Sequence, residues 1–347
     1  MLSETMSYQK KFATVNGKQI AYIEEGSGDP IVLLHGNPTS SFLWRNVIPE
    51  LTASGRVIVP DLIGQGDSEK LPASEGPGRY TLEVAYSYVD GLLDSLGANA
   101  NVTLVIHDWG SAIGFMWAMR HPAAVKGVAY MEGIVKPISW ADWPEGAVGI
   151  FKGFRSDKGE DMILNRNMFI EAVLPSSVMR TLSEAEMEAY RAPHPEADDR
   201  QPLLNWPRQI PIDGEPEDTV ALVTEYGAFM ADSQIPKLFI NADPGSILTG
   251  PQREFCRSWP NQQEVTVKGL HFIQEDSPVE IITFDDNIKH LEGAEPRPGR
   301  MIIFQFPSEA AAETWYNDPE YQALSEHRRA GAELISLTMV HGLPPRT

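Results

Sequence analysis

Short apolar runs alternate with helical stretches along the first two thirds of the chain, and this alternation predicts the fold. Residues 31–34 are apolar without interruption, which is typical of a parallel strand buried on both faces. Residues 12–25 instead alternate around Asn16-Gly17, a pattern that predicts a β-hairpin. Strands that alternate with helices build a mostly parallel sheet covered by helices on both faces, the α/β class. The further predicted elements are strands at 56–60, 102–106, 126–131, 236–240 and 264–267, and helices at 42–51 and 81–96.

This alternation stops at residue 133 and resumes near residue 214. Prolines, tryptophans and short helical stretches occupy the interval, which we interpret as a helical cap inserted into the sheet domain. The insertion follows the strand next to 102–106, on the side of an open α/β sheet where ligands bind. The predicted organisation is a core of two parts, 1–132 and 214–281, with a cap at 133–213 between them.

The sharp turn between strand 102–106 and the next helix carries the main candidate for chemistry. Asp108 stands at this turn, and Gly110 and Gly114 follow it four residues apart. A strand-to-helix turn with small neighbours is the context of a nucleophile elbow, which holds its central side chain exposed above a sheet. The usual residue at that position is serine, whereas here it is aspartate. A helix cap is the alternative role for Asp108, because aspartate commonly caps helices.

A histidine after the last predicted strand gives Asp108 a chemical partner. The order of Asp108, an acid and then His271 is the order of nucleophile, acid and base in α/β-hydrolases. A carboxylate can displace a leaving group from saturated carbon and form an ester, which water then hydrolyses with His271 as general base. Glu132 and Asp243 are both candidates for the acid that supports the imidazolium, since each follows a predicted strand.

Two neutral hydrogen-bond donors point to a halide as the leaving group. Trp109 offers an indole N–H and Asn37 an amide NH2, which stabilise a departing halide without trapping it as a buried cation would. An epoxide oxygen requires acidic donors, usually a pair of tyrosines, and the predicted cap offers Tyr190 without an obvious second. Hydrolysis of carbon–halogen bonds is therefore the leading hypothesis. Epoxide hydrolysis and a ligand-binding α/β-hydrolase relative without turnover are the alternatives.

Five motifs resemble those of haloalkane dehalogenases, over residues 8–281. They are HGNPTS (35–40), HDWGS (107–111), YME (130–132), NWPRQIP (205–211) and LHFIQEDSP (270–278). The resemblance is greatest to the branch that includes the bacterial hexachlorocyclohexane-pathway dehalogenase. It implies an α/β-hydrolase fold and an oxyanion hole made by the backbone N–H groups of Asn37 and Trp109. The implied side-chain roles are Asp108 as nucleophile, His271 as base, Glu132 rather than Asp243 as supporting acid, and Asn37 with Trp109 as halide ligands.

The same resemblance implies an apolar substrate pocket, which desolvates the Asp108 carboxylate and raises its reactivity. Ser177 and Trp143 depart from the family, which has an aliphatic residue and a phenylalanine at these positions. The small, polar Ser177 predicts a wider entrance, so the substrate preference of the family does not carry over. The expected wall residues are Trp143, Phe151, Phe169, Val173, Ser177, Trp206, Pro207, Ile210, Ile247 and Phe272.

Residues 282–347 depart from the family, which continues with a terminal helix packed on the sheet. The motifs FQFPS (304–308) and WYNDPEYQAL (315–324) resemble uncharacterised ferredoxin-like α+β domains that associate through their sheets. Only a partial β-β-α-β pattern is present, so its open edge predicts pairing with another chain, or with the core, in a homo-oligomer. A passive tail is the alternative. The predicted elements are a linker (295–299), a strand (301–306), a helix from Pro307-Ser308 and a last strand (334–341).

Composition and charge narrow the class of protein further. The chain has 347 residues, 42% of them hydrophobic, which predicts a sizeable core in one large domain with an insertion, or in two domains. Its net charge of −20 disfavours nucleic acids and anionic membranes as partners. A single cysteine, Cys256, excludes an internal disulfide framework, and no apolar stretch has the length of a membrane span. We therefore expect a soluble, cytoplasmic enzyme without metal or cofactor, whose ligands are a halogenated hydrocarbon and a halide ion.

Overall fold

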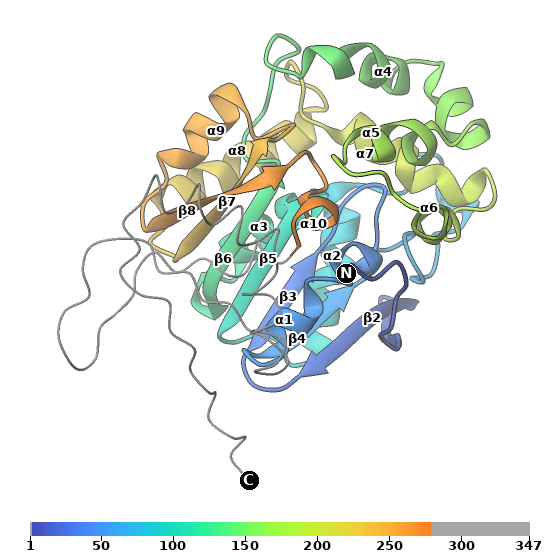
Figure 1. Cartoon of the computed structure of the whole chain (residues 1–347). Helices are drawn as coiled ribbons and strands as arrows, with labels where there is room; N and C mark the ends of the chain where they lie inside the picture. Colours follow the sequence, from blue (N-terminus) through green and yellow to red (C-terminus); the bar gives the residue numbers. More distant parts are fainter. Residues whose placement is uncertain (1, 279–347) are drawn as a thin grey trace, which may run out of the picture. The chain divides into compact units, whose positions relative to one another are not determined.

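The computed structural model describes residues 2–278, which form an eight-stranded sheet flanked by helices (Figure 1). The strand order is β1-β2-β4-β3-β5-β6-β7-β8. β1 and β2 form the predicted hairpin, β2 pairs antiparallel with β4, and every later pairing in the sheet is parallel. The predicted α/β class is therefore confirmed. The strands are β1 Lys11–Val15, β2 Lys18–Gly26, β3 Pro30–Leu34, β4 Arg56–Pro60, β5 Val102–Asp108, β6 Val125–Gly133, β7 Lys237–Pro244 and β8 Gln262–Gly269.

The helices of the core are η1 Ser41–Trp44, α1 Ile48–Leu51, η2 Ala73–Glu75, α2 Leu82–Ser95, α3 Trp109–Arg120, η3 Pro122–Ala124, α8 Glu217–Asp232, α9 Gly250–Arg257 and α10 Ile273–Asp276. The predicted helix 81–96 is present, and the hydroxyl of Thr81 caps it by accepting the N–H of Val84. The helical stretch predicted at 42–51 is present as two short helices, η1 and α1. Pro49 in the first turn of α1 has no N–H to continue a helix from η1.

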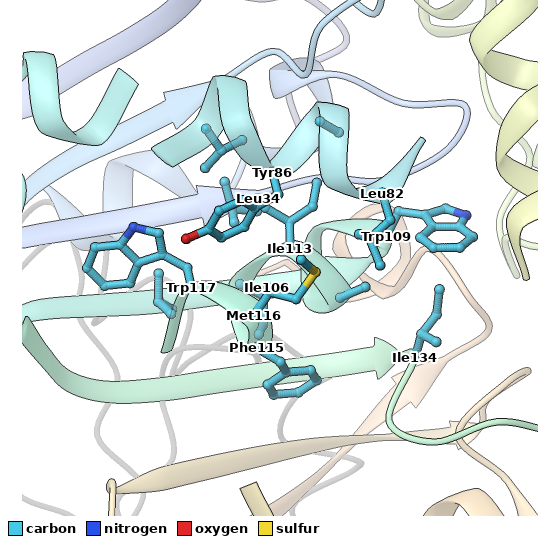
Figure 2. Close-up of a cluster of buried hydrophobic side chains, with 14 of the residues drawn as sticks. Leu34, Leu82, Tyr86, Ile106, Trp109, Ile113, Phe115, Met116, Trp117 and Ile134 are labelled. Atoms are coloured by element: carbon cyan, nitrogen blue, oxygen red, sulfur yellow. The ribbon is translucent and has the colours of Figure 1, made fainter. Parts of the chain in front are cut away.

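Residues of one strand alternate between the two faces of the sheet, and each face has its own core. On one face, Val32 and Leu34 of β3 pack with Leu92 of α2 and Ile113 of α3. On the opposite face, Leu33 joins a second buried cluster that includes Ile48 of α1 and Phe272 before α10. Figure 2 shows the first cluster around α3, with Trp109 and Trp117 at its opposite ends. This two-sided burial explains why the sequence of β3 is apolar without interruption.

A group of helices separates β6 from α8 in the chain, in the segment predicted as a cap. Helices α4, α5, α6 and α7 lie together at one end of the sheet (Figure 1). Arginines join α4 to α7: Arg155 donates to the carbonyl of Pro207 at 2.9 Å, and Arg208 donates to the carbonyl of Phe154 at 3.2 Å. The boundaries 133–213 stay a prediction. The helices are α4 Glu145–Arg155, η4 Asp161–Asn165, η5 Phe169–Val173, α5 Leu174–Ser176, α6 Glu184–Arg191, η6 Asp198–Arg200 and α7 Gln201–Gln209.

Three sequence predictions concern membranes, metals and the C-terminal segment. None of the helices within residues 2–278 combines the length and the apolar character needed to cross a membrane. The same residues contain no group of three or more side chains of the metal-binding types placed to hold an ion. The segment predicted at 282–347 lies outside the described residues.

Helix α3 begins in close contact with the sheet, and this contact requires glycine. A Cβ atom on Gly110 would lie 2.3 Å from the carbonyl oxygen of Leu34 and 2.5 Å from that of His35. A Cβ atom on Gly114 would lie 2.7 Å from a methyl carbon of Ile106. The two small residues noted in the sequence therefore let α3 start directly above β3 and β5, with Asp108 at the junction.

We expect Gly110→Ala to destabilise the protein by about 2 kcal/mol or more, because the added methyl group meets backbone atoms that cannot move independently. Gly149→Ala is the matched control, since a Cβ on Gly149 of α4 meets nothing within 4 Å. Its expected effect is a stabilisation of about 0.5–1 kcal/mol from the loss of glycine flexibility in a helix. Urea denaturation followed by tryptophan fluorescence measures both. Equal stability of the two variants would contradict the close contact.

Candidate active site

The backbone at Asp108 is strained, and this strain presents its carboxylate at the carboxyl end of β5. Its φ of 50° and ψ of −128° lie in a region that residues with a side chain rarely adopt. The backbone N–H of Asn37 donates to Oδ1 at 2.7 Å, and the backbone N–H of Trp109 also hydrogen-bonds the carboxylate. A Cβ on Gly36 would lie 2.0 Å from Oδ1, so the loop after β3 closes tightly on it. The side chain makes no capping hydrogen bond to α3, contrary to the alternative role.

His271 stands between Asp108 and Glu132. Its Nε2 lies 3.4 Å from Oδ2 of Asp108, and its Nδ1 lies 3.2 Å from Oε2 of Glu132. Glu132 is fully buried at the end of β6, where its Oε2 also accepts the N–H groups of Ser246 at 2.9 Å and Ile247 at 2.8 Å. Asp243, the other candidate acid, is exposed on β7. Of the two acids left open by the residue pattern, the structure brings Glu132 to the histidine.

The charges of this group depend on each other. Burial by itself lowers the pKa of His271, but the hydrogen bonds to Asp108 and Glu132 outweigh burial and raise the pKa to about 9. Burial raises the pKa of Asp108, but its hydrogen bond and attraction to His271 outweigh this and hold the pKa below its ordinary value. At neutral pH the resting site therefore contains a carboxylate beside an imidazolium.

His107 is a site residue that the sequence reasoning missed. Its Nε2 lies 2.8 Å from the backbone carbonyl oxygen of His271. Burial lowers the pKa of His107 to about 3, so the ring is neutral and its Nε2–H donates to this carbonyl. The bond fixes the backbone of the loop that carries His271. The quoted HDWGS motif contains His107, but its partner is 164 positions away in the chain, so local pattern could not reveal the contact.

The two expected halide ligands face the same cavity as Asp108. Both Asn37 and Trp109 are lining residues, and the described structure offers neither polar atom of the Asn37 side-chain amide a partner. A buried amide without partners costs about 1–3 kcal/mol, so this group is available for a ligand. The Trp109 ring packs on Trp206, with ring centroids 4.7 Å apart. The donors and the carboxylate therefore meet in one space, as the sequence hypothesis requires.

The cavity has a volume of about 700 Å³ and is lined mainly by apolar side chains. Trp206 is outside the lining, unlike the other expected wall residues, because it lies behind Trp109 and donates its N–H to Gln65 at 3.1 Å. The polar residues Lys136, Ser246, Thr249 and Gln252 line the cavity but were not expected. The expected wall residues that do line it are Trp143, Phe151, Phe169, Val173, Ser177, Pro207, Ile210, Ile247 and Phe272.

A buried charge cluster ties the cap segment to the loop that carries His271. Arg45 donates to Glu275 and to Glu186, both at 2.6 Å, and Arg180 donates to the same two carboxylates, also at 2.6 Å. Tyr190 donates its hydroxyl to Glu275. Because Glu275 lies on α10, four residues after His271, these bonds hold α10 against α6. The hydroxyl of Tyr190, the tyrosine that epoxide hydrolysis would require in the cap, is thus already bound to Glu275.

A strand-to-helix elbow that carries a carboxylate beside a histidine–acid pair, above a parallel sheet, defines an α/β-hydrolase. The family model described as "alpha/beta hydrolase fold" matches residues 29–278. A second model, described as a domain of unknown function (DUF1330), matches residues 274–343.

Comparison with known proteins identifies a narrower family within the α/β-hydrolases. A haloalkane dehalogenase of Sphingobium indicum is 55% identical over 274 residues, which cover 79% of this chain and 92% of the relative. One from Mycolicibacterium smegmatis is 51% identical, over 78% of this chain and 88% of the relative. The crystal structure of the haloalkane dehalogenase DbeA from Bradyrhizobium elkani matches with a TM-score of 0.75 and 39% identity, over 80% of this chain and 95% of that one. This chain belongs to the haloalkane dehalogenase family.

Asp108→Asn tests the coupling of charges in this site. The variant keeps the shape of the side chain but removes its negative charge, one of the influences that raise the pKa of His271. We therefore expect the pKa of His271 to fall from about 9 to well below that value. Histidine ring signals followed by NMR through a pH titration measure the change. Glu24→Gln is the control, since Glu24 pairs with Lys11 away from the site. A titration of His271 near 9 in both variants would contradict the coupling.

Proposed function

We propose that this chain hydrolyses haloalkanes, converting a haloalkane and water into an alcohol, a halide ion and a proton. One observation carries the proposal. The Asp108 carboxylate has one oxygen bound to the backbone N–H of Asn37 and the other directed to His271, within a mainly apolar cavity that Asn37 and Trp109 also line. The printed names of the relatives from Sphingobium and Mycolicibacterium, both haloalkane dehalogenases, support the same reaction.

In the first step, a carboxylate oxygen of Asp108 attacks the carbon that carries the halogen. A carbon–oxygen bond forms, and the carbon–halogen bond breaks with its electron pair on the halide. The side chains of Asn37 and Trp109 donate hydrogen bonds to the departing halide. The product of this step is a neutral ester on Asp108. An apolar cavity favours the step because it removes water from the attacking carboxylate.

In the second step, water attacks the carbonyl carbon of this ester. The negative charge of the tetrahedral intermediate develops on the oxygen that faces the backbone N–H groups of Asn37 and Trp109, which therefore act as an oxyanion hole. His271 takes the proton of the attacking water, and Glu132 stabilises the imidazolium that forms. The intermediate collapses to release the alcohol and restore the Asp108 carboxylate.

The first step also prepares His271 for the second. In the resting site the pKa of His271 is about 9, so the ring is protonated and cannot accept a proton. Ester formation removes the negative charge of Asp108, and with it one influence that raises this pKa. The ring then loses its proton more readily and becomes a base at the stage of the reaction that needs one.

The contacts of Tyr190 count against the epoxide alternative. Its hydroxyl donates to Glu275 within the buried charge cluster, and Tyr190 is not among the residues that line the cavity. The neutral donors that do line it suit a halide, which needs no proton. A ligand-binding relative without turnover is not favoured either, because each member of the predicted catalytic group is present.

His271→Ala is expected to stop the reaction after the first step. Asp108 still attacks the haloalkane, but no base activates water, so the ester accumulates. Intact-protein mass spectrometry after incubation with 1-bromobutane should show a mass increase equal to one butyl group. Mass spectrometry of a digest should locate this group on the peptide that contains Asp108. Asp108→Ala is the control and should show no adduct. An unmodified His271→Ala protein after long exposure would contradict the mechanism, provided that the wild type releases bromide.

We also propose the domain organisation that the sequence predicts, with a core at 1–132 and 214–281, a cap at 133–213 and an appended segment at 282–347. The appended segment forms a partial ferredoxin-like α+β domain, through which the chain associates with a second copy. The match of residues 274–343 to the DUF1330 model supports the presence of a separate segment after the core. The single, buried Cys256 supports a reducing, cytoplasmic location.

Removal of the appended segment is expected to dissociate the assembly. The full chain and a chain ending at residue 281 are compared by light scattering coupled to size-exclusion chromatography. We expect a multimer for the full chain and a monomer for the short chain. Halide release by the short chain shows that it is folded. A monomeric full chain would contradict the proposed association. If both chains formed the same multimer, the association would involve a surface outside the appended segment.

A further inference from the structure

The cavity above Asp108 has a polar part that the dehalogenation mechanism does not use. Lys136 comes from the segment after β6, while Thr249 and Gln252 come from the start of α9. These three residues line the same cavity as Asp108 and His271. A haloalkane without further polar groups offers nothing for them to bind.

Lys136 is the charged residue of this polar part. It is half-buried, and no carboxylate of residues 2–278 lies within 4 Å of its ammonium group. Its Nζ lies 5.7 Å from the centroid of the Phe255 ring. The chain as a whole has 48 acidic and 28 basic residues, so acidic partners are abundant elsewhere. Lys136 lines the cavity and forms no ion pair with a carboxylate of residues 2–278, so its charge is available for an anionic ligand.

The two neighbours of Lys136 on α9 also retain hydrogen-bonding capacity. Thr249 occupies the N-cap position of α9, yet its side chain makes no capping hydrogen bond. Gln252 is buried, and its amide nitrogen has one long contact of 3.5 Å to the carbonyl oxygen of Pro137. Thr249, Gln252 and Lys136 line one cavity, and a hydroxyl, an amide and an ammonium group are donors that suit the oxygens of a carboxylate.

We propose that Lys136, Thr249 and Gln252 form a subsite for a carboxylate, so that the enzyme accepts haloalkanes with a carboxylate at the opposite end of the carbon chain. This inference rests on the proposed dehalogenation. The negative charge of Asp108 in the cavity repels an anionic substrate, and the positive charge of Lys136 in the same lining offsets this repulsion. The reaction itself is unchanged: the carbon–halogen bond is hydrolysed, the halide and a proton leave, and the carboxylate remains intact in the ω-hydroxycarboxylate product.

The test compares three substrates that share a six-carbon chain: 6-bromohexanoate, 6-bromohexan-1-ol and 1-bromohexane. Bromide release gives kcat and KM for the full chain and for Lys136→Met, which keeps the length of the side chain but removes its charge. For 6-bromohexanoate, we expect Lys136→Met to raise KM about tenfold or more, as loss of a charge-assisted hydrogen bond would. For 1-bromohexane, KM should change less than about twofold. High salt should raise the wild-type KM for 6-bromohexanoate alone.

Lys158→Met is the matched control, because it removes the same charge from an exposed position outside the cavity. It should leave the KM for 6-bromohexanoate unchanged. An equal effect of both variants would overturn the subsite in favour of a general effect of net charge. An equal loss for the alcohol and the carboxylate would overturn the recognition of charge. Turnover of 1-bromohexane without turnover of 6-bromohexanoate would overturn this inference alone, whereas no bromide from any substrate would overturn the dehalogenation as well.

Discussion

The contact between the Asp108 carboxylate and the backbone N–H groups beside it is the interaction on which the site depends. The N–H of Asn37 orients one oxygen, and the other oxygen faces His271. The imidazolium of His271 balances the negative charge of this carboxylate in the resting site. Gly36 and Gly110 have no side chains that would prevent the loop after β3 and the start of α3 from approaching so closely. The strained backbone at Asp108 is the structural cost of this approach.

The position of His271 depends on parts of the chain that are far apart in sequence. Glu132 binds its ring, and His107 binds its backbone carbonyl. The loop then continues into α10, where Glu275 enters the buried cluster with Arg45. Removing one member of such a buried cluster leaves an uncompensated charge, which is strongly destabilising. His271 is therefore held by the core on one side, and its loop is held by the cap segment on the other.

The cavity combines two environments in one space. Apolar residues such as Phe151, Phe169 and Phe272 lower the polarity around Asp108, which strengthens every electrostatic interaction there. The part lined by Lys136 and its neighbours is polar. The apolar part suits any haloalkane. The polar part distinguishes substrates that carry a carboxylate from those that do not. A cavity of about 700 Å³ has room for a chain that reaches from one to the other.

The sequence by itself determined the order of the elements, the elbow and the residue types at the candidate site. This was possible because buried parallel strands need continuous apolar runs, and because Asp108 and Trp109 adjoin such a strand. The tertiary structure decided the rest. The sequence left Glu132 and Asp243 equal as acids until a resemblance favoured one, and it placed Trp206 in the wall rather than behind Trp109. It did not reveal the contact of His107 with His271, the buried cluster around Arg45 or the polar side at Lys136. Each of these depends on which distant segments the fold brings together, and the periodicity of a single segment contains no information about its partners.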